Sequence, residues 1–406
     1  MSHLFKPKLR NVIDIQRTIY QNEPVFVLQD NLKLTEAAIL LPQYLGPLAV
    51  LCNGQRTVPE IKADLKREFD LSLSQIDIEN LVAQFDEALL LEGATFDQAK
   101  REAVKLYRAK PHRESSLAGV SYPASPAALK RQLKNYVDRV GQVKPSSANS
   151  RAIISPHIDY PRGGEVYAKV WTSATEAVRQ AELVIVIGTD HKGSFGAVTL
   201  TPQHYATPLG VLPTELELVD KLAQVVGHER AYAEEIHHRD EWSIELDLVW
   251  LQFIRGNKPV PIIPILAGSF RHFMLDEAEV EQDSHLTAFV EALREIMAQR
   301  RTLIVASGDL AHLGPYFDTA PVDSAGFARM ERDDTALLET LSQGSARQFL
   351  DFMHAGQHER NVCGLSPFWF TLSALEKSKG QLIAYDRCPV PGFSTSFVSV
   401  CGLVWE

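Results

Sequence analysis

The segment Leu183-Val-Ile-Val-Ile-Gly-Thr-Asp-His191 decides the fold class of this chain. Its short apolar run is typical of a strand buried in a parallel sheet, and a histidine follows the run closely. Two further segments repeat this pattern, Ala152-Ile-Ile-Ser-Pro-His157 and Thr302-Leu-Ile-Val-Ala-Ser-Gly-Asp-Leu-Ala-His312. Each histidine alone could be an ordinary loop residue bonded to backbone. Because ligands of open α/β sheets bind beyond the carboxyl ends of such strands, three together predict a metal or acid/base site.

Strand and helix patterns alternate from Leu117 to the C-terminus, which predicts one α/β domain with a mostly parallel, helix-covered sheet. The expected strands lie near residues 152–155, 183–187, 197–201, 262–266, 302–306 and 395–405. The expected helices cover residues 125–140, 163–179, 214–226, 243–254, 276–299, 325–342 and 364–377.

The N-terminal part of the chain lacks this alternation and predicts a small winged-helix module. A strand pair is expected near residues 25–34, and capping boxes at Thr57 and Ser74 each predict the start of a helix. Gly93 then ends the second helix, and Ala94-Thr-Phe is a candidate returning strand.

The domain boundaries follow from these patterns and from a polar stretch between them. We expect the module in residues 1–108, a linker in residues 109–116 and the α/β domain in residues 117–406.

Composition narrows the classes of function. The 406 residues include 41 Lys and Arg against 51 Asp and Glu, and the net charge of −10 disfavours nucleic acid as a partner. Four cysteines without a paired motif are typical of a reducing compartment. The longest uncharged stretch, residues 37–52, is broken by prolines and too short to span a membrane comfortably, and the N-terminus lacks the apolar run of a signal peptide. We therefore expect a cytoplasmic protein without membrane or nucleic-acid contacts.

His157 and His191 are the strongest candidate metal ligands, because each closely follows a rigid strand. Asp159 and Asp190 beside them are candidates to orient the imidazoles. Cys363 precedes an apolar helix, whose N-terminus would lower the pKa of the thiol and suit it to bind metal. The alternative for Cys363 is a small buried apolar residue.

His312 is a candidate general acid/base, with Asp309 one turn earlier fixing its tautomer. The cluster Glu241-Trp-Ser-Ile-Glu245 opens a helix, and capping by Ser243 or Asp240 is its simplest explanation. The pair His237-His238 is expected in a surface loop, because adjacent side chains diverge.

Seven short motifs give the chain a resemblance to a known family. They are Leu117-Ala-Gly-Val-Ser-Tyr-Pro, Ile154-Ser-Pro-His157, Gly188-Thr-Asp-His191, Thr207-Pro-Leu-Gly, Trp242-Ser-Ile-Glu245, Ser307-Gly-Asp-Leu-Ala-His312 and Val362-Cys-Gly364. Their order over residues 117–406 resembles that of Memo-family proteins, in particular the bacterial members associated with a radical-SAM protein and an AMMECR-type protein. Residues 48–69 are similar to peptide-recognition modules that accompany radical-SAM maturases.

The resemblance implies a fold like that of class III extradiol dioxygenases and an iron or copper ion bound by two histidines and a cysteine. On this chain those ligands are His157, His191 and Cys363, and His312 matches the acid/base histidine of the dioxygenases. The chain departs from the family at Trp242, where Memo proteins usually carry histidine. It departs again beside His191, where Thr189-Asp190 and Lys192 replace the usual Pro-Ser and second histidine.

Three functions remain open. The first is redox chemistry at a mononuclear Fe(II) or Cu site, or one occupied by Zn, with an unknown small-molecule or peptide substrate. A ligand set without a carboxylate argues against an authentic extradiol dioxygenase. The alternative is a non-catalytic peptide- or protein-binding partner of a radical-SAM system, and the third is a metal-dependent hydrolase. Whether the chain is an enzyme is left open by its sequence.

Overall fold

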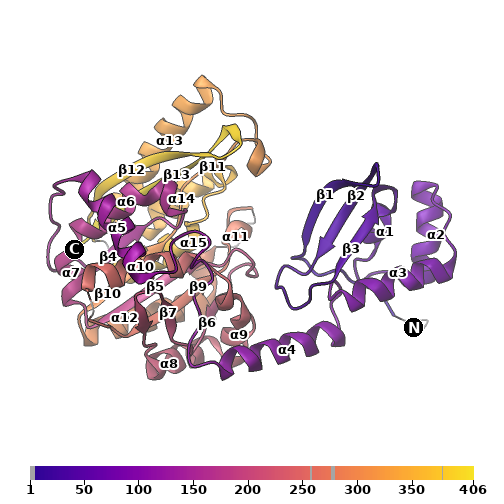
Figure 1. Ribbon diagram of the computed structural model, residues 1–406, viewed down its shortest axis with the longest axis horizontal. Helices are drawn as coiled ribbons and strands as arrows, with labels where there is room; N and C mark the ends of the chain where they lie inside the picture. The colour runs from indigo at the N-terminus through magenta and orange to yellow at the C-terminus, as the bar shows by residue number, and fades with distance from the viewer. Residues whose placement is uncertain (1–4, 257, 276–278, 377) are drawn as a thin grey trace. The chain divides into compact units, whose positions relative to one another are not determined.

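The computed structural model describes residues 5–256, 258–275, 279–376 and 378–406. The chain forms two compact units, Met1–Ala109 and Lys110–Glu406 (Figure 1). Within the described residues, no helix combines the length and apolarity needed to cross a bilayer.

The first unit begins with an antiparallel sheet of order β1-β2-β3. Its strands are β1 (Asp14–Tyr20), β2 (Glu23–Gln29) and β3 (Ala38–Pro42), and its helices are α1 (Gly46–Leu51), α2 (Val58–Phe69), α3 (Gln75–Glu87) and α4 (Ala94–Ala109). Both expected capping boxes are confirmed: Glu60 accepts the backbone N–H of Thr57 at 2.7 Å, and Ser74 accepts that of Asp77 at 3.2 Å. The winged-helix assignment itself stays a prediction.

Three expectations for this unit were wrong. The helix that begins after Ser74 ends at Glu87 rather than at Gly93. Residues 30–34 lie outside any strand, and β2 pairs instead with β1 before it and β3 after it. Residues 94–96 begin α4 rather than a returning strand. Residues 94–109 contain many strong helix formers, and this longer amphipathic pattern overrides the local β propensity of Thr95 and Phe96.

The second unit has a mixed sheet of order β11-β13-β4-β10-β5-β9-β6, with β12 paired to β13. The strands are β4 (Ala152–Ser155), β5 (Leu183–Thr189), β6 (Val198–Leu200), β9 (Ile262–Ala267), β10 (Thr302–Ser307), β11 (His312–Leu313), β12 (Gly380–Val390) and β13 (Phe393–Trp405), and β7 (Tyr205–Thr207) pairs separately with β8 (Gly210–Leu212). The expected strands are confirmed, and β7, β8, β11 and β12 are additional.

The expectation of a mostly parallel sheet was wrong. The central strands β4, β10, β5 and β9 are parallel, but β13, β11, β12 and β6 join antiparallel. Only two residues, Pro391 and Gly392, separate β12 from β13, and strands joined by so short a turn must pair antiparallel.

Helices cover both faces of the parallel centre. They are α5 (Pro126–Val140), α6 (Tyr160–Ser173), α7 (Thr175–Gln180), α8 (Leu216–Val226), α9 (His228–Tyr232), α10 (Ser243–Arg255), α11 (Arg271–Leu275), α12 (Ser284–Gln299), α13 (Ser324–Ser342), α14 (Ala346–His354) and α15 (Leu365–Leu375). The helix expected over 163–179 starts earlier and is interrupted at Ala174. For the helices expected over 276–299 and 364–377, residues 276–278 and 377 lie outside the described residues.

Alternate residues of the central strands enter two hydrophobic cores. Ile185 and Ile187 of β5 pack into one core with α8, α12 and α15, whereas Val184 and Val186 pack into the other with α5, α6 and α10. Because both faces of these strands are buried, their sequences read as continuous apolar runs.

The residues expected as a linker are partly fixed to the second unit. Arg113 is buried and forms an ion pair with Glu245 of α10. The Glu245 carboxylate also accepts the backbone N–H groups of Ser116 at 2.8 Å and Leu117 at 3.0 Å, and the hydroxyl of Tyr122. Residues 113–117 therefore follow the structure of the second unit.

Candidate metal centre

Three adjacent parallel strands carry polar side chains just beyond their carboxyl ends. His157, Asp309 and His191 each lie two residues after the last residue of β4, β10 and β5. These strands are neighbours in the order β4-β10-β5, so their ends lie side by side. The sheet thus brings these side chains to one edge, where the sequence led us to expect His157, His191 and His312.

Cys363 reaches the same edge on the loop before α15. A Cβ atom on Gly308 would lie 2.4 Å from the Cα of Gly364, so the loops after β10 and before α15 meet backbone to backbone. The Thr189 hydroxyl donates to the Cys363 carbonyl oxygen at 3.0 Å, and the Gly364 N–H donates to that of Asp309 at 3.1 Å. A side chain at Gly308 would separate the two loops, and one at Gly364 would meet the ring of Phe368 at 2.3 Å.

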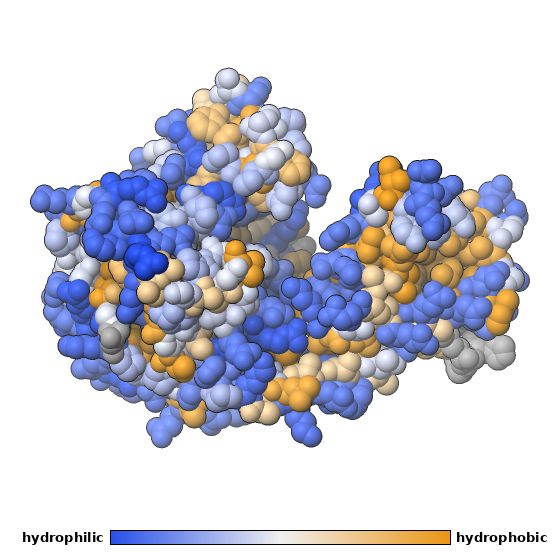
Figure 2. Space-filling model, viewed as in Figure 1, coloured by the Kyte–Doolittle hydropathy of each residue, from blue (hydrophilic) through white to orange (hydrophobic). Residues whose placement is uncertain are grey.

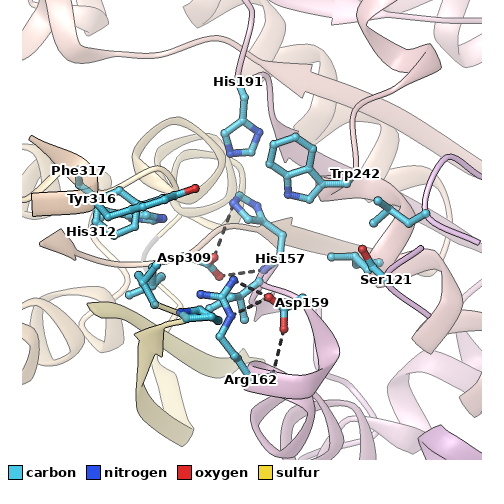
Figure 3. A pocket seen from close by; sticks show the side chains of 16 residues that line it. Ser121, His157, Asp159, Arg162, His191, Trp242, Asp309, His312, Tyr316 and Phe317 are labelled. Carbon is cyan, nitrogen blue, oxygen red and sulfur yellow. Dashed lines mark hydrogen bonds and ion pairs between the residues drawn. The ribbon is translucent and has the colours of Figure 1, made fainter. Parts of the chain in front are cut away.

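The candidate ligand atoms converge. One ligand atom from each of His157, His191 and Cys363 lies within 4.8 Å of the other two, and the same holds for Asp309, His312 and Cys363. The Nε2 of His157 is 3.1 Å from the Sγ of Cys363. Figure 3 shows the rings of His157 and His191 side by side, with their centroids 5.0 Å apart. Two overlapping sets of donors therefore share one cysteine.

His157 is suited to bind a cation as a neutral imidazole. Burial, with a smaller contribution from the neighbouring His191, lowers its pKa to about 3. Its backbone N–H donates to Oδ1 of Asp309 at 2.9 Å. Within the described residues, Nδ1 of His157 has no hydrogen-bond partner. The nearby backbone of Ser307 opposes the lowering of the His157 pKa without overcoming it.

His191 is oriented by Glu241. Its Nδ1 donates to both carboxylate oxygens of Glu241 at 3.1 Å, and its backbone N–H donates at 3.2 Å, which leaves Nε2 as the ligand atom. Burial opposes a charge on this ring, but Glu241 outweighs burial and raises the pKa of His191. The side chain is 27% exposed, so solvent reaches the ring.

Two orienting roles expected from the sequence were wrong. Asp190 accepts from Nδ1 of His237 at 2.9 Å instead of orienting His191. Asp159 caps α6 by accepting the backbone N–H of Arg162 at 3.2 Å. Asp190 points away from His191 because adjacent side chains on an extended segment diverge. Asp159 is instead held at the N-terminus of α6, where it is the N-cap residue.

Glu241 also caps α10, a role expected of Ser243 or Asp240. It accepts the backbone N–H groups of Trp242 at 2.8 Å and Ser243 at 3.0 Å. The Ser243 hydroxyl instead donates to the Thr189 carbonyl at 2.9 Å. The position of Glu241 directly before a helix was a sequence signal for capping. Its contact with His191 had no such signal, because the two residues lie 50 positions apart in the chain.

Trp242 covers one face of His191. The two rings are stacked, with centroids 4.4 Å apart and planes inclined by 16° (Figure 3). The residue that departs from the family pattern therefore contacts a candidate ligand directly.

The expected lowering of the Cys363 pKa was wrong. Burial raises the pKa of this thiol well above its ordinary value, and the negative charge of Asp309 raises it further. The backbone N–H of Asp309 donates to Sγ at 3.3 Å and opposes these effects without overcoming them. A bound cation would favour the thiolate.

His312 lies on the same pocket, but its tautomer is not fixed by Asp309. Its Nδ1 donates to the carbonyl oxygen of Leu310 at 3.1 Å, which leaves Nε2 as an acceptor. Burial lowers the pKa of His312 to about 4, so the ring is neutral near pH 7. Burial also raises the pKa of Asp309.

The expectation of a surface loop for His237 and His238 was wrong. Both lie buried in the 3-10 helix η2 (Glu235–Arg239). His238 accepts from the hydroxyl of Tyr205 at 2.6 Å and donates to the Thr199 carbonyl at 3.1 Å, as a structural residue of the core.

A pocket of about 470 Å³ lies over the candidate ligands. That volume is typical of a small-molecule site. The residues lining it include four of the candidate site residues and side chains from several separate elements: Leu117, Ser121, His157, Ile158, Asp159, Arg162, His191, Trp242, Leu246, Asp309, His312, Tyr316, Phe317, Val390, Pro391 and Val398 (Figure 3).

Comparison with known proteins assigns most of the chain to one family. The model of the Memo-like protein family matches residues 113–404. A MEMO1 family protein of Aquifex aeolicus is 24% identical over 385 residues, covering 94% of this chain and 95% of its own length. A MEMO1 family protein of Thermus thermophilus is 25% identical, covering 81% of this chain and 93% of its own length.

The N-terminal unit is not shared by all relatives. A MEMO1 family protein of Methanosarcina mazei is 27% identical and is matched over 99% of its length by only 72% of this chain. The match to the Aquifex protein covers 94% of this chain and therefore includes most of residues 1–109. A solved structure of an uncharacterized Escherichia coli protein matches with a TM-score of 0.37 at 14% identity, covering 63% of this chain and all of its own.

Proposed function

We propose that this chain, which belongs to the Memo-like protein family, holds one transition-metal ion between His157, His191 and Cys363. The observation that supports this most is that their ligand atoms, from three separate loops, lie within 4.8 Å of one another. His157 is kept neutral, and Glu241 directs the Nε2 of His191 toward the same space.

The donor chemistry supports iron or copper, with zinc as a further option. Imidazole suits all three metals, and a soft thiolate favours Cu(I), Zn and iron in sulfur-rich sites. When bound, an iron or copper ion would supply electron-transfer chemistry. The resemblance to the Memo family implies a fold like that of class III extradiol dioxygenases, and on that ground we propose an oxidative reaction.

His312 is proposed as the proton carrier beside the metal. It is neutral near pH 7, and its Nδ1–H is held by the Leu310 carbonyl, so Nε2 is available to accept a proton. Asp309 is proposed to assist by holding the His157 backbone and by adding a charge near the site.

The test is elemental analysis of protein purified without oxygen. We expect about one iron or copper ion per chain, and loss of that ion in Cys363→Ser and in the double variant His157→Ala, His191→Ala. Matched controls are Cys388→Ser and His228→Ala, because neither residue lines the pocket. Circular dichroism checks that each variant is folded.

The outcomes separate the candidate functions. Stoichiometric zinc in place of iron or copper would support the metal-dependent hydrolase. Metal retained in the double variant would contradict the ligand assignment. A fully folded protein that takes up no metal would leave the binding-partner function.

A specific observation favours that second function for the N-terminal unit. Strand β1 is exposed along its whole length at a sheet edge, where unpaired backbone groups can add another strand. Figure 2 shows apolar surface on the visible face of this unit. Two exposed apolar residues of β1, Ile15 and Ile19, share one face of the strand, and Leu40, Tyr44 and Val50 are also exposed in this unit. Such a patch is typical of a protein-binding surface.

We propose that this surface binds a peptide or protein of a radical-SAM system, either the radical-SAM protein itself or an AMMECR-type protein. The double variant Ile15→Glu, Ile19→Glu should abolish co-purification with that partner, whereas Leu106→Glu on the exposed side of α4 should not. Unchanged co-purification of the double variant would contradict the assignment of β1.

A further inference from the structure

Arg162 is the lone lysine or arginine among the described residues that line the pocket. It lies in the first turn of α6, directly after the loop that carries His157. Figure 3 shows its side chain in the pocket near Asp159 and Asp309. The amino end of α6 carries partial positive charge, which adds to that of the guanidinium.

Asp159 holds the guanidinium from one side only. Its Oδ2 accepts from Nε at 2.6 Å and from Nη2 at 2.5 Å, and its Oδ1 accepts the Arg162 backbone N–H at 3.2 Å. An arginine has five N–H donors, so the edge formed by Nη1 and the rest of Nη2 keeps its donors. Among the described residues, no acceptor hydrogen-bonds to Nη1, and the side chain is 26% exposed.

The pair with Asp159 fixes the direction of this donor edge. The ion pair neutralises the charge of the guanidinium, but it leaves two parallel N–H groups, one on Nη1 and one on Nη2, without an acceptor. These two groups fit a carboxylate in a bidentate hydrogen bond. Because the side chain is already held, little rotamer entropy is lost when a ligand binds.

The rest of the wall is largely apolar. Phe317 stands edge-on to His312 with ring centroids 5.0 Å apart. Further apolar lining residues come from the loop after Arg113, from α10 and from the C-terminal hairpin: Leu117, Leu246, Val390, Pro391 and Val398. Such a wall favours a hydrocarbon body over a polyhydroxylated or highly charged one.

We propose that the pocket binds a small organic monocarboxylate, with its carboxylate on the free edge of Arg162 and its apolar body against Phe317 and the C-terminal hairpin. The inference rests on the proposed function in one respect, because it names the class of substrate that would bind in the pocket of the proposed metal site. Recognition by Arg162 uses no metal ligand, so it is measurable with and without metal.

The experiment is calorimetric titration of the full chain with matched acids and amides. The probes are butyrate, phenylacetate and 3-phenylpropionate and their neutral amides, each tested up to roughly 10 mM, where weak ligands are still detected. We expect at least one acid to bind about tenfold or more tighter than its amide, because a hydrogen-bonded charge is worth that much.

Variants assign this preference to Arg162. Arg162→Gln should bind acid and amide equally, and Arg162→Lys should keep part of the preference because it retains charge without the fork. Arg131→Gln, an exposed arginine of α5 outside the pocket, should behave as wild type.

Three results would overturn the inference: equal affinity of acid and amide in the wild type, an unchanged preference in Arg162→Gln, or no binding of any acid in the series. Metal content measured on the same samples reports on the proposed function separately. Carboxylate binding without metal would support this inference alone, and metal binding without carboxylate preference would support the proposed function alone.

Discussion

His191 is the candidate ligand that depends most on its neighbours, because it lies on a partly exposed loop. Glu241 accepts the ring and backbone N–H groups of His191 and also the backbone N–H groups of Trp242 and Ser243. One carboxylate therefore fixes the imidazole and caps the start of α10. Ligand orientation and helix capping are therefore coupled in a single residue.

Removing the charge of Glu241 should weaken metal binding. We expect Glu241→Gln to raise the metal Kd roughly 10- to 100-fold, because a carboxylate partner both orients the imidazole and increases its basicity. Competition with a chromophoric chelator measures this Kd. Asp240→Asn is the control, since this neighbouring acid pairs with Arg239. Equal affinities of Glu241→Gln and the wild type would contradict the role.

The ring at position 242 should matter through stacking on His191. Trp242→Phe retains an aromatic face and is expected to bind metal within about threefold of wild type, whereas Trp242→Ala should lose more, since aromatic pairs contribute about 0.5–1.5 kcal/mol. The same chelator competition compares the two. An alanine variant indistinguishable from the phenylalanine variant would exclude a role for the stack.

At the scale of elements, the centre depends on the close approach of two loops. The loop after β10 and the loop before α15 touch at Gly308 and Gly364, and Phe368 fills the remaining space, since a Cβ on Gly364 would lie 2.3 Å from its ring. This packing sets where Cys363 lies relative to the strand ends.

A single added methyl group should disturb this contact. Gly364→Ala is expected to lower the free energy of unfolding by about 1–3 kcal/mol, as overpacking does elsewhere, and to reduce bound metal. Urea unfolding and elemental analysis measure the two effects. Gly326→Ala in α13 is the control, because its new Cβ would approach no atom closer than 3.2 Å. Equal losses in both variants would contradict the packing argument.

At the scale of the whole molecule, the second unit should be independent of the first. The Methanosarcina mazei relative is matched nearly end to end by 72% of this chain, and residues 110–406 contain both large cores around the sheet. We expect residues 110–406 alone to fold and to bind the same amount of metal as the full chain. Calorimetric melting and elemental analysis test this, and an aggregated or metal-free fragment would contradict it.

The buried pair Arg113–Glu245 should give the second unit an acid-sensitive stability. Burial by itself would raise the pKa of Glu245, but the Arg113 charge and hydrogen bonds from Tyr122 and Ser116 lower it below the ordinary value. Because the unfolded-state pKa is about 4.3, this stabilisation is complete above that pH and is lost as pH falls through the lower folded-state pKa.

Glu245→Gln should therefore cost stability at pH 7 and flatten its dependence on pH. We expect a loss of about 3 kcal/mol or more, because Arg113 is left buried without a charge partner. Below pH 4.3 the wild type should lose up to about 1.4 kcal/mol per pH unit more than the variant. Urea unfolding at pH 7 and pH 3.5 measures both, and Glu165→Gln, an exposed acid of α6, should change neither. A wild type and variant with parallel pH dependence would contradict the assignment.

The sequence by itself determined the central strands, most helices and the convergence of His157, His191 and His312 on one pocket. Their strands are short apolar runs, and parallel strands present their carboxyl ends at one edge whatever the loops do. The capping boxes at Thr57 and Ser74 were equally legible, because a capping box acts within four residues.

Only the tertiary structure decided which neighbours act on these residues. Glu241 rather than Asp190 orients His191, the Leu310 carbonyl rather than Asp309 holds His312, and burial overrides the helix end at Cys363. The antiparallel pairings of β13 with β4 and of β6 with β9 were likewise settled between segments far apart in the chain. Local patterns specify elements and their ends, whereas hydrogen-bond partners and desolvation depend on segments that meet only when the chain is folded.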